Sequence, residues 1–184
     1  GHPVKRRFSR RRQSYRATIC SGINNLWQLI RTPEKYNGFS EWMVTNESPD
    51  GYSLMHMTGQ TQDLHVGDIV ALQALGDHSE LATTWHVCIV RWAVSENPEH
   101  IELGLQILAP KATAVEITHT HALESCKIAA LILAPTPPLR PTQSLVVPAG
   151  LLRENTRRII VVIEADNLEI REVQATSLDE QTSA

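Results

Sequence analysis

One short segment near the start of the chain has its apolar residues at helical spacing. The residues that recur at positions i, i+3, i+4 and i+7 are Ile23, Leu26, Trp27 and Ile30. Ser21 can cap the start of such a helix, and Pro33 ends it because proline cannot continue the helical hydrogen bonding. The pattern therefore predicts one helix over residues 22–31, followed by a turn-rich stretch at 32–40.

Most of the remaining sequence consists of short apolar stretches of strand length, separated by turn-forming residues. The clearest covers residues 101–108, where apolar and other residues alternate as they do in a half-buried strand. Turn signals such as Pro49-Asp50-Gly51 and Asn97-Pro98 separate the stretches. The strands predicted up to this point cover residues 17–20, 42–46, 52–57, 68–74, 85–93 and 101–108. This spacing predicts a mainly β fold, with an antiparallel barrel or sandwich.

Pro110 marks a boundary, after which further strands are predicted. These cover residues 113–119, 126–133, 144–147, 158–164 and 168–173. All nine aromatic residues lie at or before Trp92, so we expect the second half to pack with aliphatic side chains alone. We predict a basic N-terminal arm at 1–16, a β-barrel domain at 17–110 and a smaller β unit at 111–184 for docking or oligomerisation.

Composition limits the class of protein. The chain has 184 residues, 42% of them hydrophobic, which is enough for a substantial core. No apolar run approaches the roughly 20 residues that span a bilayer, and the early basic residues are not followed by a leader-like apolar stretch. The three cysteines are widely spaced and form no CxxC pair, which favours reduced, buried thiols. We therefore expect a cytoplasmic protein.

The charge is distributed very unevenly. Residues 1–16 hold seven of the 17 Lys and Arg residues and no acidic residue, so the rest of the chain has ten cations against 20 acids. Such an arm cannot bury apolar surface of its own, and we expect it to be disordered in isolation. Six of its cations are arginines, whose planar donor fork matches phosphate oxygens and the O6/N7 edge of guanine. The arm therefore predicts a polyanionic partner.

Two short motifs lie on either side of the predicted helix. Residues Arg12–Arg16 read RxxxR, and residues Asn46–Gly51 read NxSxxG. Together they resemble the PilZ domain, the bacterial receptor for cyclic di-GMP, which has RxxxR at the mouth of its first strand and [D/N]xSxxG in the turn after the next strand. The resemblance covers residues 10 to about 110. It continues through Val66-Gly67-Asp68, Val90-Arg91-Trp92 and Glu102–Leu105.

The resemblance implies a ligand site on the outside of the barrel, covered by the arm. Arg12 and Arg16 would bind phosphates or guanine edges, and Asn46 would bind the guanine edge through its carboxamide. Ser48 would supply a hydroxyl, and Gly51 would allow a backbone turn with positive φ close to the ligand. These roles break no bond, so we expect a receptor that uses no cofactor and is not an enzyme.

Arg11 lies directly before the first motif, and in the family an arginine there accompanies binding of a stacked ligand dimer. Two stacked nucleotides carry four phosphate charges, which favours an additional cation. We therefore expect Arg11 to contact a second cyclic di-GMP molecule. Ligand binding would order the arm and thereby change the contacts with a downstream protein.

Two other interpretations of the sequence stay open. The basic arm is also typical of nucleic-acid-binding modules, and a PilZ-like interaction module can lack ligand binding. His119 and His121 would share one face of a strand, but no fourth ligand is evident, so no metal site is predicted. Trp42, Trp85 and Trp92 are expected mainly in the core or at the barrel ends.

Overall fold

The computed structural model describes residues 14–59, 61, 64–75, 85–97, 99–119, 127–135, 142–148, 158–164 and 168–174. For Thr118, His119 and the two segments after residue 157, the description covers the backbone alone. Arg11, Arg12, His121 and Cys126 lie outside the described residues.

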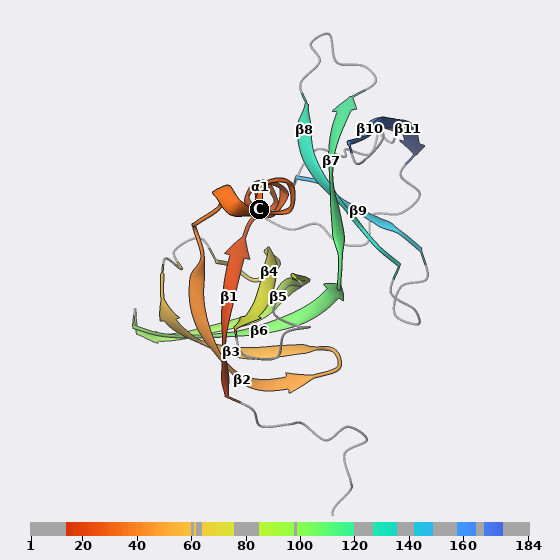
Figure 1. Ribbon diagram of the computed structural model, residues 1–184. Helices are drawn as coiled ribbons and strands as arrows, with labels where there is room; N and C mark the ends of the chain where they lie inside the picture. The colour runs from red at the N-terminus through yellow and green to blue at the C-terminus, as the bar shows by residue number, and fades with distance from the viewer. Residues whose placement is uncertain are drawn as a thin grey trace, which may run out of the picture.

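Six antiparallel strands close into a barrel, which confirms the predicted fold class (Figure 1). They are β1 (Tyr15–Ser21), β2 (Ser40–Ser48), β3 (Gly51–Thr58), β4 (Ile69–Leu75), β5 (His86–Asn97) and β6 (His100–Ala109). Their order around the barrel is β1-β2-β3-β6-β5-β4, and β4 pairs back onto β1. β1 begins at Tyr15 rather than at residue 17, so Arg16 lies within the first strand instead of before it.

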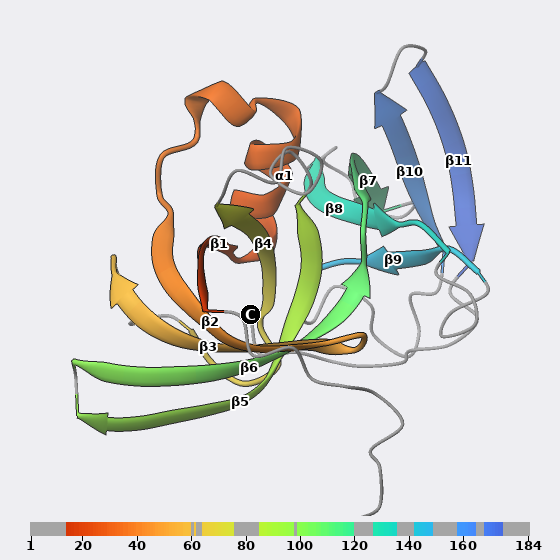
Figure 2. The same cartoon turned by 60° about the horizontal axis from the view of Figure 1, so that its bottom comes forward.

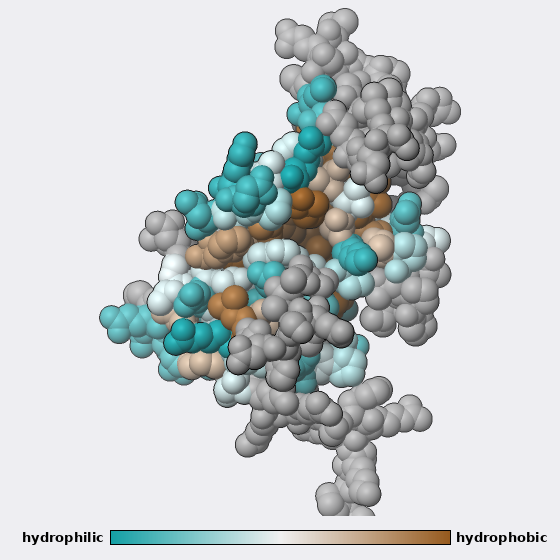
Figure 3. Space-filling view, viewed as in Figure 1, coloured by the Kyte–Doolittle hydropathy of each residue, from teal (hydrophilic) through white to brown (hydrophobic). Residues whose placement is uncertain are grey.

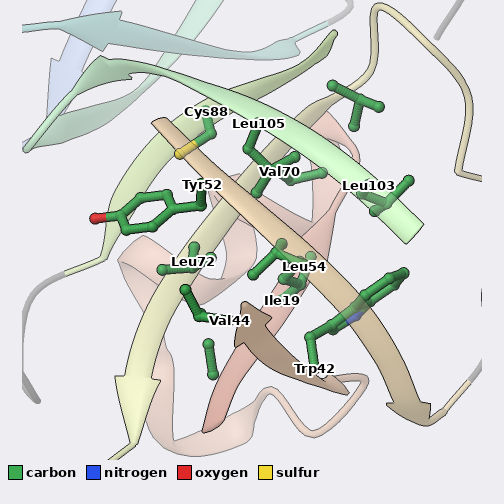
Figure 4. Close-up of a cluster of buried hydrophobic side chains, with 12 residues drawn as sticks. Ile19, Trp42, Val44, Tyr52, Leu54, Val70, Leu72, Cys88, Leu103 and Leu105 are labelled. Carbon is green, nitrogen blue, oxygen red and sulfur yellow. The ribbon is translucent and has the colours of Figure 1, made fainter. Parts of the chain in front are cut away.

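Alternate residues of the strands fill the barrel interior (Figure 4). Trp42, Val44 and Leu54 are almost completely buried there. The Trp42 indole nitrogen donates a hydrogen bond to Ser40 Oγ at 2.7 Å, so burying this large side chain leaves no unpaired donor. Cys88 also lies in this interior, and burial raises the pKa of its thiol to about 12.

One outer wall of the barrel is covered. Helix α1 (Ile23–Arg31) packs against it, and a short 3₁₀ turn, η1 (Pro33–Lys35), leads from the helix towards β2. The helix buries Ile23 and Leu26 of the predicted face and also Leu29, which was not part of that face. Trp27 and Ile30 of the predicted face are partly buried. The wall beneath is a row of paired, outward-facing and fully buried residues from four strands: Cys20, Ala71, Val87 and Ala109. In Figure 1 the helix lies between the barrel and a second sheet.

The second sheet has five strands in the order β11-β10-β7-β8-β9. They are β7 (Ala112–His119), β8 (Ile128–Leu133), β9 (Ser144–Val146), β10 (Arg158–Glu164) and β11 (Leu168–Gln174), close to the predicted ranges. One of its clusters is aliphatic, around Val115 and Ile117. The second sheet also packs against a cluster that it shares with the helix and the barrel, and this cluster includes aromatic residues from the first half of the chain. The expectation of purely aliphatic packing was therefore wrong.

Trp27 shows how this contact is made. Its indole nitrogen donates a hydrogen bond to the Val115 carbonyl oxygen of β7 at 2.9 Å, and its ring packs against the cluster that holds Leu131 and Leu133. The helix thus contributes to the packing of both sheets. In the space-filling view, apolar surface gathers in the middle of the molecule, at the level of this junction (Figure 3).

The far end of β5 extends past its neighbour β4. β5 pairs with β4 through residues 86–89 only, whereas its pairing with β6 continues to Asn97. Residues 91–97 are all exposed, and they form one strand of a two-stranded ribbon at the edge of the barrel (Figure 2). No helix in the described part of the chain combines the length and the apolar character needed to cross a bilayer.

Candidate functional site

The NxSxxG residues form the end of the β2–β3 hairpin. Ser48 pairs with Gly51 across a two-residue turn of Pro49 and Asp50, and Ser48 Oγ donates a long hydrogen bond to the Gly51 carbonyl oxygen at 3.4 Å. Neither Pro49 nor Asp50 has a positive φ. Proline fixes φ near −65°, so the sequence itself favours this turn conformation. Proline therefore restricts the backbone directly after Ser48.

A β-bulge sits directly before Asn46. Val44 pairs with Leu54 and Asn46 pairs with Ser53, so Thr45 is the additional residue on β2. Bulges re-aim the side chains that follow them. Paired residues of a ladder share one face, and here Asn46 shares the outer face with Ser53, whereas Val44 and Leu54 point into the core.

The same outward-facing row continues over two more strands. Ser53 pairs with Gly104 of β6, and Gly104 pairs with Trp92 of β5. These residues line a surface pocket of about 190 Å³. The lining includes the small residues Ser53 and Gly104 together with larger polar or aromatic ones, among them Asn46, Ser48, Arg91, Trp92 and Gln106.

Trp92 covers Gly104. A Cβ atom on Gly104 would collide with the Trp92 indole, at its Nε1 atom first, so only glycine allows the ring to lie this close to the sheet. Trp92 is 42% exposed, so it is neither a core residue nor a sealed barrel end, and that expectation was wrong for this residue. It holds for Trp42, which is fully buried.

Asn46 contributes an unsatisfied acceptor. Its Oδ1 atom is buried and, among the described residues, has no hydrogen-bond partner. A buried acceptor without a partner costs about 1–3 kcal/mol relative to one that is paired. An N–H donor that entered this pocket could remove the cost.

Gly51 does not have the conformation that we expected. Its φ is not positive; among the described residues only Gly22, Gly59 and Gly67 have positive φ. A Cβ atom on Gly51 would instead collide with the backbone carbonyl oxygen of Leu105. Glycine is needed here because β3 approaches β6 closely, which shapes the pocket floor rather than bringing the turn to a ligand.

Charges of both signs surround the pocket. The Arg91 Nε–H group donates to Gln106 Oε1, and the carboxylates of Glu47 and Asp50 lie on the lining as well. Glu47 Oε2 accepts a hydrogen bond from the Tyr15 hydroxyl at 3.0 Å. Burial, with the nearby Glu47 charge, raises the pKa of Tyr15, so this hydroxyl stays a donor at neutral pH.

Arg16 lies on the same outer surface but not in the pocket lining. It pairs with Met43 of β2, three residues before Asn46, or about 10 Å along the strand. Its side chain is exposed and has no hydrogen-bond or ion-pair partner among the described residues. The structure therefore brings together Asn46, Ser48 and Gly51, and it places Arg16 beside them. The predicted contacts of Arg11 and Arg12 fall outside the described residues.

Sequence comparison agrees with this geometry. Residues 28–114 match the family described as "Cyclic-di-GMP receptor FimW, middle PilZ domain". This part of the chain is a PilZ domain. The match contains the NxSxxG hairpin and every residue of the pocket lining, and it starts after Arg16 and ends within β7. No curated protein matches the chain.

Nine residues of the pocket lining in the PilZ domain were not predicted as site residues, and Ser53, Gly104 and Gln106 are among them. Gly104 and Gln106 were predicted as parts of an alternating strand, and Gly104 also lies in the stretch 102–105 of the PilZ resemblance. The register across β2, β3, β6 and β5 brings them to the site, and register is set by long-range pairing.

Among the described residues, no group of three or more His, Cys, Asp or Glu side chains could hold an ion. Of the described histidines, His86 is half-buried with its ring near that of Tyr52, and burial lowers the pKa of its imidazole. The side chains of His119 and His121 lie outside what the structure describes.

Proposed function

We propose that this protein is a receptor for cyclic di-GMP, which binds between the outer surface of the PilZ domain and the N-terminal RxxxR arm. The family match supports the ligand, and the pocket on the β2–β3–β6–β5 surface supports the place. The pocket is smaller than the roughly 300–1,000 Å³ that encloses a drug-sized ligand. It would therefore hold one part of the dinucleotide, and the arm would cover the rest.

The unpaired Oδ1 atom of Asn46 is the observation that carries this proposal. Guanine presents two adjacent donors, N1–H and N2–H, on its pairing edge. A carboxamide oxygen can accept from them, and the terminal bond of an asparagine side chain turns easily enough to present it. The ligand would thus supply the donor that the described protein groups do not.

Trp92 and the small residues beside it suit a flat base. The Trp92 indole packs directly over Gly104 and is 42% exposed, and the small residue Ser53 lies next to Gly104 in the same row. Stacking of a base on an aromatic ring contributes about 1–3 kcal/mol. A guanine that contacts Asn46 on one edge can reach this ring from the same pocket.

The arm would supply the positive charge that the pocket lacks. The lining holds two carboxylates, Glu47 and Asp50, against the single guanidinium of Arg91. A ligand with two phosphate charges therefore needs further cations, and Arg16 of β1, which pairs with Met43 of β2, can supply one. Arg12 would add a second guanidinium from the arm, and Ser48 would exchange its long bond to Gly51 for a ligand atom.

Binding would act as a signal because it orders the arm. An arm that is held across the barrel presents a different surface to a downstream protein than a free one. Arg11 would contact a second, stacked ligand. Titration of the full chain should then give two ligands per protein, and Arg11→Ala should reduce this to one.

Isothermal titration of the full chain tests the proposal. The parent should bind cyclic di-GMP but not cyclic di-AMP or GTP, and Arg16→Ala and Asn46→Ala should each weaken binding about tenfold or more. The exposed Arg31 and Asn37 lie away from the pocket, so Arg31→Ala and Asn37→Ala are matched controls that should bind as the parent does.

A double variant provides the strictest check. If Arg16→Ala combined with Ser48→Ala bound cyclic di-GMP as tightly as the parent, the proposed site would be wrong. Duplex DNA binding that falls steeply with rising salt would instead favour a nucleic-acid module, because counterion release dominates that interaction. A folded parent that binds neither ligand would be an interaction module without the receptor function.

A further inference from the structure

The hydrogen bond between Tyr15 and Glu47 joins two parts of the molecule that the proposed ligand must bridge. Tyr15 stands at the start of β1, directly before Arg16, at the point where the arm enters the barrel. Glu47 lies between Asn46 and Ser48 in the NxSxxG motif. The two residues are 32 positions apart in sequence, and the 3.0 Å bond between their side chains joins the arm to the hairpin.

The bond also spans the bulge that positions Asn46. In the ladder Tyr15 pairs with Val44, not with Glu47, so its side chain reaches three residues further along β2 to make this contact. Thr45, the additional residue of the bulge, and Asn46 both lie within the span. A bulged strand is locally freer than a regular ladder because one residue is left unpaired. A contact from the neighbouring strand across the bulge restricts that freedom.

Both partners are held in place by the core. The Tyr15 ring packs against the cluster inside the barrel, and Glu47 pairs in the ladder with the buried Tyr52. The Glu47 charge lies close to Tyr15, Tyr52 and His86, and only the Tyr15 hydroxyl donates a hydrogen bond to it among the described contacts. This hydrogen bond therefore connects the first strand to the hairpin, with Tyr15 as donor and Glu47 as acceptor.

We infer that Tyr15 and Glu47 are a positioning pair, which holds Asn46 and Arg16, at the end of the arm, in the arrangement that cyclic di-GMP requires. The inference rests on the proposed function. Neither residue contacts the ligand through this role. The carboxylate of Glu47 lies on the pocket lining, where its negative charge would repel the two phosphates of the ligand. A carboxylate at this place is explained if its hydrogen bond matters more than its charge.

This conflict between charge and hydrogen bond gives a sharp test. Glu47→Gln removes the charge but keeps an oxygen that accepts from Tyr15, whereas Glu47→Ala removes both. Tyr15→Phe keeps the packed ring and removes the donor. Tyr36→Phe is the matched control, because it removes a tyrosine hydroxyl bonded to the Gly38 carbonyl oxygen at 3.1 Å, away from the pocket.

Titration of cyclic di-GMP into these full-length variants should give opposite results for the two Glu47 changes. Tyr15→Phe and Glu47→Ala should each weaken binding about tenfold, since a hydrogen bond to a charged group is of that size. The double variant should be no weaker than either single one, because both break the same contact. Glu47→Gln should bind at least as tightly as the parent, and Tyr36→Phe should bind as the parent does.

Several outcomes would overturn the inference. If Glu47→Ala bound more tightly than the parent, Glu47 would act only through its charge; if Tyr15→Phe bound equally well, the hydroxyl would have no role. Thermal unfolding of each variant without ligand separates positioning from loss of fold, and the contrast between Gln and Ala at position 47 holds even if Tyr15→Phe is unstable. A parent that fails to bind refutes the proposed function, and the inference falls with it. A parent that binds, with Arg16→Ala weakened but Tyr15→Phe unchanged, refutes the inference alone.

Discussion

The barrel has two outer walls with the same backbone pattern and opposite chemistry. On each wall a row of residues crosses four strands and contains at least one small side chain. The covered row is Cys20, Ala71, Val87 and Ala109, and the open row is Asn46, Ser53, Gly104 and Trp92. The covered row offers only weak hydrogen-bonding groups, whereas the open row has an amide, a hydroxyl and an indole.

If the open wall binds the ligand as proposed, one scaffold separates stability from binding. Helix α1 and the second sheet bury the first wall, and burial of apolar surface contributes about 25 cal/mol for each Å² removed from water. The second wall keeps its polar groups accessible and carries an unsatisfied acceptor, which is tolerable because the first wall supplies stability elsewhere. Changes on one wall should therefore affect mainly one of the two properties.

The largest effect is expected from Leu26→Ala on the covered wall. Leu26 is fully buried between the barrel and the second sheet, so its truncation should lower the free energy of unfolding by about 3 kcal/mol. Urea denaturation measures this change, with the exposed Gln28→Ala of the same helix as control. Cyclic di-GMP affinity of the folded variant should equal that of the parent. A large loss of affinity would show that the two walls are not independent.

A smaller effect on stability, but a clear effect on binding, is expected from Gly104→Ala on the open wall. The added methyl group would displace the Trp92 indole, and overpacking of this kind costs about 1–3 kcal/mol. Because Trp92 lines the pocket, cyclic di-GMP affinity should fall as well.

A Trp92→Ala background provides the control for this displacement. With the indole gone, Gly104→Ala should change the free energy of unfolding little, since the two changes share one contact. If Gly104→Ala lowered the free energy of unfolding equally in the Trp92→Ala background, the added methyl group would collide with something other than the Trp92 indole.

The smallest effect is expected from pH. Burial on the covered wall raises the pKa of the Cys20 thiol from 9.0 to about 11. The folded state therefore keeps this proton longer than the unfolded chain does. The contribution of the protonated Cys20 thiol to the free energy of unfolding is fully present below about pH 9. It declines as pH rises towards 11, by about 1 kcal/mol per pH unit.

Urea denaturation between pH 8 and pH 11 measures this decline, and Cys20→Ala should make it shallower. Part of the slope should stay in that variant, because Cys88 and Tyr52 have pKa values raised by burial in the same direction. An identical slope in the parent and in Cys20→Ala would show that the thiol of the covered wall is not buried from water.

Local patterns in the sequence predicted the elements well. The helical spacing of Ile23, Leu26 and Ile30 and the alternation in residues 101–108 both correspond to elements of the structure. The two-residue turn at Pro49 and Asp50 also follows from local chemistry, because proline restricts the backbone there. Such features depend on neighbours in the sequence, and the sequence alone suffices for them.

Features that depend on pairing between distant strands could not be predicted in this way. Gly51 has the residue type of a turn, but it is glycine because of the Leu105 carbonyl oxygen on another strand. Gly104 and Trp92 meet only through the register of β5 and β6. The covering of one wall by α1 likewise depends on where β7 and β8 pack. Asn46 and Ser48 could be predicted as site residues from the sequence because the family pattern that contains them is local.

The overhanging end of β5 has a consequence for solubility. Beyond Val90 this strand has β6 on one side and no strand partner on the other among the described residues, so it presents unpaired backbone groups to solvent. An edge of this kind can template pairing with other chains. Here the ladder is irregular at two places, between Val90 and Trp92 and between Ser95 and Asn97, and Glu96 adds a charge. These interruptions make the edge a poor template for stacking strands, so Trp92 can stay exposed beside the pocket without promoting aggregation.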